Sequence, residues 1–159
     1  MRITEVRVYQ HNITVAGGPY EMAISAVDTL DSTVVELMTD EGVSGFGETT
    51  PLGPTYQPQH ALGARAAIAE MAPQLIGLNP LRTGLVRRAM DSALTGHNYA
   101  KSAIDVACWD LLGKVRGERL CDLLGGTDRH AVASYFGVMP DTATRTAHAA
   151  RAREDEGYS

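Results

Sequence analysis

The chain has 159 residues, of which 44% are hydrophobic and 21% are charged, and its formal net charge at pH 7 is −5. This composition is globular and excludes a wholly disordered protein. Nucleic-acid binding is disfavoured because there is no cluster of Lys and Arg, and no apolar run approaches the roughly 18 residues of a membrane helix. Met1–Glu5 carries an early acid and lacks the apolar segment of a signal peptide. Cys108 and Cys121 lack metal-type spacing, so we expect a reduced, cytoplasmic setting.

The N-terminal part of the chain is predicted to be β structure. Its first segment alternates Val6 and Val8 with polar residues, as in a half-buried strand. A short turn with a glycine joins the second and third segments, which is typical of a hairpin. The three predicted antiparallel strands are Ile3–Gln10, Ser32–Thr39 and Val43–Glu48. Between the first two lies Val15–Thr29, which we expect to be a mobile loop because it contains a Gly-Gly-Pro sequence.

A second irregular segment, Thr49–Pro58, contains three prolines and a glycine, which exclude regular structure. Helical sequence follows in Gln59–Met71, which is rich in alanine, and in Leu81–Leu94. The clearest helix carries a continuous apolar stripe with helical spacing, formed by Ala100, Ala103, Ile104, Ala107, Cys108 and Leu111. Gly117 is expected to end this helix.

A different pattern begins after the third helix. Leu120–Gly126 is predicted to be a turn or a short helix. Ala131–Val138 is predicted to be a strand, and Thr142–Glu156 a polar, Ala-rich helix. A strand followed by a helix is typical of the first step of a parallel β/α architecture.

The sequence carries no self-contained catalytic motif. It has no metalloprotease-type histidine pair, no phosphate-binding Gly-x-x-x-x-Gly-Lys loop and no Gly-x-Ser-x-Gly elbow. Gly45-Phe46-Gly47 is too short for a dinucleotide fingerprint and leads into an irregular segment. Four acids could be imagined as metal ligands but are better explained by turn or helix-surface hydrogen bonds: Asp40, Glu41, Asp105 and Asp110.

Three segments in order carry a family resemblance. Ala100–Lys114 reads AKSAIDVACWDLLGK, and Asp40–Glu48 reads DEGVSGFGE. Leu120–Gly126 reads LCDLLGG, preceded by Arg119 where the family pattern often has proline. With the opening strand, these segments resemble the N-terminal part of the mandelate racemase/muconate lactonizing enzyme group of the enolase superfamily. The resemblance covers the whole chain.

This resemblance implies an α+β capping domain over residues 1–126, with a three-stranded antiparallel sheet followed by a helical bundle. Residues 127–159 would then form the first β/α unit of a truncated TIM-type barrel, since a complete barrel takes about 250 residues. The family binds a carboxylate substrate on Mg²⁺ and removes the proton α to the carboxylate. The catalytic bases and the metal ligands are expected beyond Ser159. Lys101 and Lys114 are assigned structural roles, so no catalytic or metal residue is expected within this chain.

The capping domains of this family close the active site with two loops, which correspond here to Val15–Thr29 and Thr49–Pro58. Tyr56, in the second loop, is the main candidate for substrate binding, because its ring can cover a ligand and attract an ammonium group. The alternative is that Tyr56 packs the loop against the domain. Tyr20 and Tyr135 are further candidates, for which a solvated or packing role is the preferred interpretation.

The second loop is also similar to that of a narrower subgroup, the hydroxyproline-betaine or proline-betaine epimerases and the cis-3-hydroxyproline dehydratases. The sequence therefore predicts an isomerase, a racemase or epimerase of a proline betaine or another N-modified proline. One alternative is a dehydratase of hydroxyproline or an acid sugar, and another is a non-catalytic α+β binding or interaction domain. The expected partners are a small carboxylate with a quaternary or ring ammonium and a second copy of the chain in a homo-oligomer, without nucleic acid or membrane.

Overall fold

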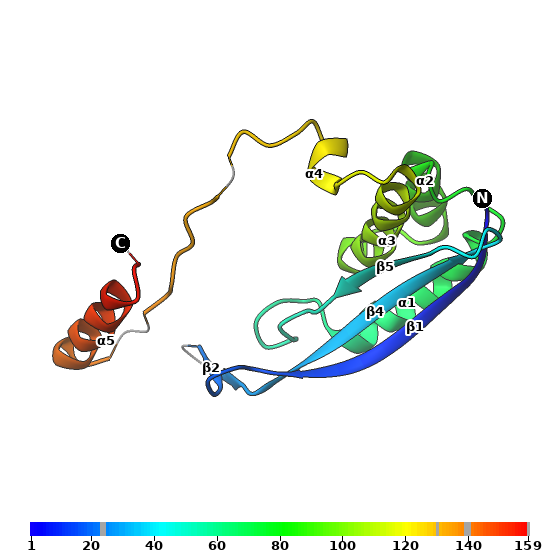
Figure 1. Ribbon diagram of the computed structural model, residues 1–159. Coiled ribbons are helices and arrows are strands. Elements are labelled where there is room, and N and C mark those ends of the chain that lie inside the picture. Colours follow the sequence, from blue (N-terminus) through cyan, green and yellow to red (C-terminus); the bar gives the residue numbers. More distant parts are fainter. Residues whose placement is uncertain (23–24, 130, 139–140, 159) are drawn as a thin grey trace.

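The computed structural model describes residues 1–22, 25–129, 131–138 and 141–158. Three antiparallel strands form a sheet in the order β1-β4-β5, with β1 at Ile3–Thr14, β4 at Thr29–Thr39 and β5 at Ser44–Thr49 (Figure 1). The predicted three-stranded antiparallel sheet is confirmed. Strands β1 and β4 are longer than the predicted Ile3–Gln10 and Ser32–Thr39, because their pairing continues to Thr14 opposite Thr29.

The segment predicted to be a mobile loop contains a second, two-stranded ladder of β2 (Tyr20–Glu21) and β3 (Ala26–Val27). Backbone hydrogen bonds hold this segment together. Val15 N–H donates to the Asp28 carbonyl at 2.9 Å, and Met22 N–H donates to the Ser25 carbonyl at 2.8 Å. The loop prediction was wrong for these strands, because each has only two residues, too few for an alternating side-chain pattern.

The predicted helices are confirmed, with slightly different ends. They are α1 (Ala61–Met71), continued by the 3₁₀ turn η1 (Ala72–Gln74), then α2 (Thr83–Ala93) and α3 (Asn98–Arg116). The ring of His60 accepts from Gly63 N–H at 3.1 Å and so caps the start of α1. Gly117 adopts φ 65° at the end of α3, the left-handed conformation that a glycine supplies without strain.

The core lies between one face of the sheet and these helices, and the strands contribute Ile3, Val35 and Leu37 to it. α3 lies unusually close to β5 because two strand glycines carry no side chain. A Cβ atom on Gly47 would lie 1.9 Å from the Ala103 carbonyl oxygen, and one on Gly45 would lie 2.2 Å from that of Ala107. The Gly-Phe-Gly sequence of the hairpin therefore serves the packing of α3 on the sheet.

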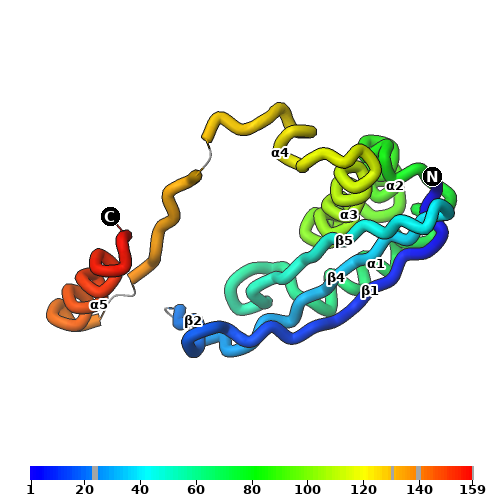
Figure 2. The backbone as a smooth tube through the Cα atoms, in the orientation of Figure 1, coloured from blue at the N-terminus to red at the C-terminus, as the bar shows by residue number. Residues whose placement is uncertain are grey.

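After α4 (Leu120–Leu123), the chain runs away from the sheet to α5 (Ala143–Asp155), which stands apart in Figures 1 and 2. The predicted strand at Ala131–Val138 does not form, although the helix after it does. None of the strands in the described part of the chain pairs with this segment to satisfy its backbone groups, and Val132 is 84% exposed. None of the helices in the described residues has the length and apolar character to cross a membrane.

Candidate functional site

The two irregular segments predicted to cover a ligand lie at the same end of the sheet. Figures 1 and 2 show the loop after β5 beside the end of the sheet from which β1 and β4 continue toward β2. A hollow of about 310 Å³ lies between the start of β4, at Thr29–Asp31 where the first segment ends, and Pro51–Pro54 of the second segment. The start of α1, from His60 to Leu62, completes its lining.

Tyr56 projects from a tight turn in the second loop. The backbone N–H groups of Tyr56 and Gln57 both donate to the Gly53 carbonyl at 3.1 Å, and Gly53 has φ +116°. Pro51 is buried and fixes the beginning of the loop against the domain. The ring of Tyr56 is 66% exposed, so it is presented outward by the loop and does not pack it against the core.

The other two predicted tyrosines differ in position. Tyr20 lies on β2 with 55% of its surface exposed, at the end of the sheet that also carries the Tyr56 loop. Tyr135 lies on the segment that forms no strand and is 92% exposed. The core packing preferred for Tyr135 is therefore not observed. The structure places Tyr20 and Tyr56 in one region of the molecule and Tyr135 in another.

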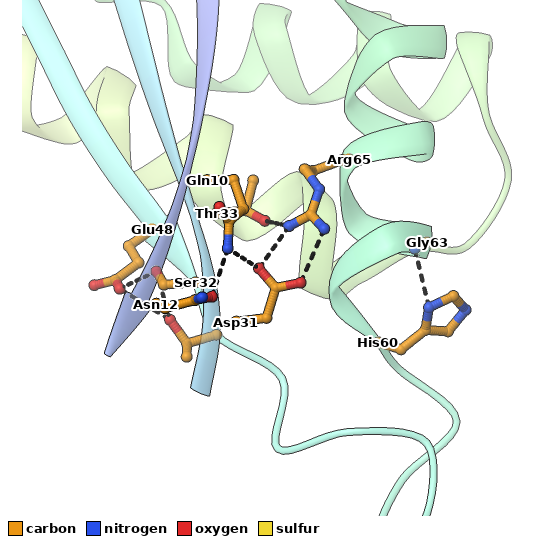
Figure 3. A network of polar contacts seen from close by, with 10 residues as sticks. Gln10, Asn12, Asp31, Ser32, Thr33, Glu48, His60, Gly63 and Arg65 are labelled. Atoms are coloured by element: carbon orange, nitrogen blue, oxygen red, sulfur yellow. Dashed lines mark hydrogen bonds and ion pairs between the residues drawn. The ribbon is translucent and has the colours of Figure 1, made fainter. Parts of the chain in front are cut away.

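A network of polar side chains stands at the base of the two loops (Figure 3). Arg65 of α1 makes a bidentate ion pair with Asp31 of β4, with both N···O distances at 2.9 Å. Arg65 also donates to the Thr33 hydroxyl at 3.1 Å, and Gln10 of β1 donates to Asp31 at 3.1 Å. Hydrogen bonding from Arg65, with a smaller contribution from Gln10, lowers the pKa of Asp31.

The neighbouring residue on β4 binds the start of the Tyr56 loop. The Ser32 hydroxyl donates to Glu48, the Thr50 hydroxyl donates to the Glu48 carboxylate at 2.9 Å, and Ser32 and Thr50 lie 3.0 Å apart. Hydrogen bonds from Ser32 and Thr50 lower the pKa of Glu48, and the electrostatic interaction with His11 has a smaller effect in the same direction. Ser32 is completely buried, whereas Glu48 is exposed, so the carboxylate joins a buried hydroxyl to the surface of the sheet.

The sequence contained no signal for this network. Asp31 and Arg65 are 34 residues apart, and Ser32 and Glu48 are 16 apart. Single polar residues at strand ends are common, and only the pairing of β4 with its neighbours brings these side chains together. Asp31 and Ser32 are only two of several polar residues in β4, so their identity alone did not distinguish them.

The described residues do not offer a magnesium site. No group of three or more His, Cys, Asp or Glu side chains among them could hold a metal ion. Several acids near the sheet have other partners in this part of the structure. Asp110 accepts from Phe46 N–H at 2.8 Å and from Lys114 at 2.6 Å, and Asp40 accepts from Arg2 N–H at 2.7 Å.

Residues 3–125 match the family model described as the mandelate racemase/muconate lactonizing enzyme, N-terminal domain. The chain therefore belongs to this family, whose capping fold is the one described above. Among known proteins it is similar to a cis-3-hydroxy-L-proline dehydratase from Roseibium aggregatum. The two are 44% identical over 160 residues, which cover 100% of this chain and 44% of that protein. A hydrophobic dipeptide epimerase from Enterococcus faecalis is 33% identical over 132 residues, covering 83% of this chain and 37% of that protein.

Solved structures show the same similarity. A member of the enolase superfamily from Roseovarius nubinhibens ISM has a TM-score of 0.91 and 41% identity, covering 99% of this chain and 42% of that one. A structure of a superfamily member from the same organism in complex with magnesium has a TM-score of 0.90 and 41% identity over the same shares of the two chains. The chain thus spans less than half the length of the relatives it matches.

Proposed function

We propose that this chain is the capping part of a Mg²⁺-dependent enolase-superfamily enzyme that acts on a proline derivative. Residues 1–126 form the capping domain in this proposal, and residues 127–159 begin the barrel. The observation that carries it is the 44% identity over the whole chain with a cis-3-hydroxy-L-proline dehydratase. The chain's own contribution is to cover the substrate with the loops that carry Tyr20 and Tyr56.

The chemistry proposed for the intact protein is removal of the proton α to the substrate carboxylate, which gives an enediolate. Magnesium would be held outside the described residues, which fit no such site, and the bases are proposed to lie beyond Ser159. The loops would exclude water from the reacting carboxylate, which strengthens electrostatic stabilisation inside the site. The exposed ring of Tyr56 would face the cationic ring nitrogen of the substrate.

The enediolate has two fates, and the relatives support both. Expulsion of a β-hydroxyl is dehydration, and the cis-3-hydroxy-L-proline dehydratase favours this outcome. Return of a proton to the opposite face is epimerisation, which the hydrophobic dipeptide epimerase and an N-succinyl-L-Arg/Lys racemase support as the second candidate. A non-catalytic binding module is disfavoured because these relatives are named as enzymes. Homo-oligomerisation stays a prediction.

The test uses the full-length protein with Mg²⁺ in D₂O and three probes: cis-3-hydroxy-L-proline, proline betaine and D-galactonate. Proton NMR follows exchange of the α proton and loss of the β-hydroxyl. We expect dehydration of cis-3-hydroxy-L-proline and loss of activity when EDTA removes the metal. Epimerisation of proline betaine without dehydration would establish the second candidate in its place. Absence of α-proton exchange with both proline derivatives would overturn the proposal.

The role of Tyr56 is tested by comparing kcat/KM between variants of Tyr56 and a control variant. A cation–π contact contributes about 0.5–2 kcal/mol, so Tyr56→Ala should lower kcat/KM for cationic proline substrates by roughly 3- to 30-fold. Tyr56→Phe should retain most of the activity because it keeps the ring. Tyr9→Ala is the matched control, because Tyr9 is an exposed tyrosine on β1 that binds Glu36. An equal loss for Tyr56→Ala and Tyr9→Ala would exclude the contact.

A further inference from the structure

The first residues of β4 are bound to both ends of the loop that carries Tyr56. Asp31 and Ser32 are consecutive, so their side chains point to opposite faces of the sheet. Figure 3 shows Asp31 turned toward Arg65 of α1 and Ser32 turned toward Glu48 of β5. The Tyr56 loop leaves β5 at Thr49 and enters α1 at Ala61, so one short stretch of β4 contacts the element on each side of it.

On the face of the sheet that packs against the helices, the ion pair between Asp31 and Arg65 connects β4 to α1. Both carboxylate oxygens accept from the guanidinium at 2.9 Å, which fixes the direction as well as the distance of the contact. The side chain of Arg65 is 23% exposed and that of Asp31 is 40% exposed. The pair therefore fixes the first turns of α1, where the loop ends, against β4.

On the opposite face of the sheet, hydrogen bonds from hydroxyl groups connect β4 to the end of β5. Glu48 accepts from both Ser32 and Thr50, and Thr50 is the first residue after β5. The carboxylate therefore ties the start of the Tyr56 loop to β4. Loss of the Ser32 hydroxyl removes the only one of these two donors that lies on β4, and leaves the exposed Glu48 carboxylate to Thr50 and water.

The same stretch of β4 also ends the segment that carries Tyr20. β4 begins at Thr29, two positions before Asp31, and Thr29 and Asp31 border the 310 Å³ hollow whose other wall is Pro51–Pro54. A displacement of the first residues of β4 would therefore move the bases of both loops together.

We propose that Asp31 and Ser32 are positioning residues that hold the two covering loops in one fixed relation. The inference rests on the proposed function of the loops as the cover of the substrate site. Neither residue is expected to touch the reacting atoms. Asp31→Asn and Ser32→Ala should therefore raise KM for proline-type substrates about fivefold, the effect of losing roughly 1 kcal/mol of ordering, while kcat changes less than twofold. Arg65→Gln should also raise KM, because it removes the ion pair to Asp31. Arg65→Lys should raise KM less than Arg65→Gln does, because it keeps the charge but not the bidentate geometry.

A readout that needs no substrate tests the inference independently. Hydrogen–deuterium exchange of the full-length protein, followed by mass spectrometry, measures backbone protection in residues 15–29 and 49–60. We expect Asp31→Asn to accelerate exchange at least about threefold in both segments. Ser32→Ala removes the hydroxyl on the opposite face of the sheet, and it should accelerate exchange to a similar extent in residues 49–60.

Asp91→Asn is the control, since it breaks the ion pair to Lys101 between α2 and α3 and should lower the Tm without accelerating exchange in either loop. Unchanged exchange in both loops for Asp31→Asn and Ser32→Ala would overturn the inference, even in a protein that dehydrates hydroxyproline. An effect of Asp91→Asn on the loops equal to that of Asp31→Asn would also overturn it, because the effect would then be general destabilisation. If the protein does not act on proline derivatives, the exchange result still decides whether Asp31 and Ser32 hold the loops.

Discussion

The ammonium group of Lys101 lies 2.7 Å from the carboxylate of Asp91, and this pair joins α3 to α2. Lys101 also donates to the Leu94 carbonyl at 2.6 Å, at the end of α2, where a cation is favoured. Lys101 is 1% exposed, whereas the side chain of Asp91 is 47% exposed. Hydrogen bonds from Lys101 and then Arg87 lower the pKa of Asp91.

Because Lys101 is buried and Asp91 is half exposed, replacing one partner should lower the stability of the fold by a different amount from replacing the other. Asp91→Ala leaves a buried ammonium without its counter-ion and should destabilise the protein by about 3 kcal/mol. Lys101→Met keeps an apolar stem in the same space and leaves a carboxylate that water can solvate, so it should cost about 1 kcal/mol. Urea unfolding of the two variants measures the difference. A larger loss for Lys101→Met than for Asp91→Ala would contradict the argument.

Replacement of a glycine in β5 by a larger residue should disrupt the packing of α3 on the sheet. In Gly47→Ala the new methyl group would meet the Ala103 carbonyl oxygen, which is backbone and cannot move alone. We expect a loss of about 3 kcal/mol or failure to fold, because overpacking of this kind forces the backbone to shift. Gly84→Ala in α2 is the control, since nothing lies within 4 Å of its added Cβ. That variant should gain about 0.5–1 kcal/mol from helix propensity. Equal Tm values for the two variants would exclude close packing as the role of Gly47.

The network at the loop bases predicts acid sensitivity. The folded-state pKa values of Asp31 and Glu48 lie below their ordinary values of 3.8 and 4.5. Their stabilising contribution is therefore fully present above those ordinary values and is lost as the pH falls through the lowered ones. The Tm of the wild type should fall more steeply below about pH 4.5 than that of the Asp31→Asn/Glu48→Gln double variant. Parallel Tm curves between pH 7 and pH 3 would show that neither carboxylate contributes in this way.

Cys108 is predicted to be unreactive in the folded protein. It is fully buried in the stripe of α3, and burial, with a smaller effect from Asp105, raises the pKa of its thiol to about 12. Because the thiolate is the nucleophile, iodoacetamide at pH 8 should modify Cys108 only after denaturant is added. Mass spectrometry of peptides measures the modification, and Cys121, which is partly accessible, controls for the reagent. Rapid native-state alkylation of Cys108 would show that α3 opens locally.

The main elements of the capping fold were predictable from local patterns. The alternation of Val6 and Val8 on β1, the glycine-containing turn between β4 and β5, the apolar stripe of α3 and the glycine that ends α3 are all local features. Such patterns reflect side-chain periodicity and backbone conformation, which neighbouring residues determine. The position of Tyr56 in a proline-rich loop was visible for the same reason.

The tertiary structure decided what depends on a partner distant in sequence. The pairing of Asp31 with Arg65 requires β4 and α1 to pack together, and no spacing in the sequence indicates it. The ladder of β2 and β3 has two residues in each strand, which are too few for a side-chain pattern. Ala131–Val138 has the composition of a strand, but no described strand pairs with it, and it forms no regular structure. Composition determines the tendency of a segment, whereas hydrogen bonding and burial against distant residues determine whether that tendency is realised.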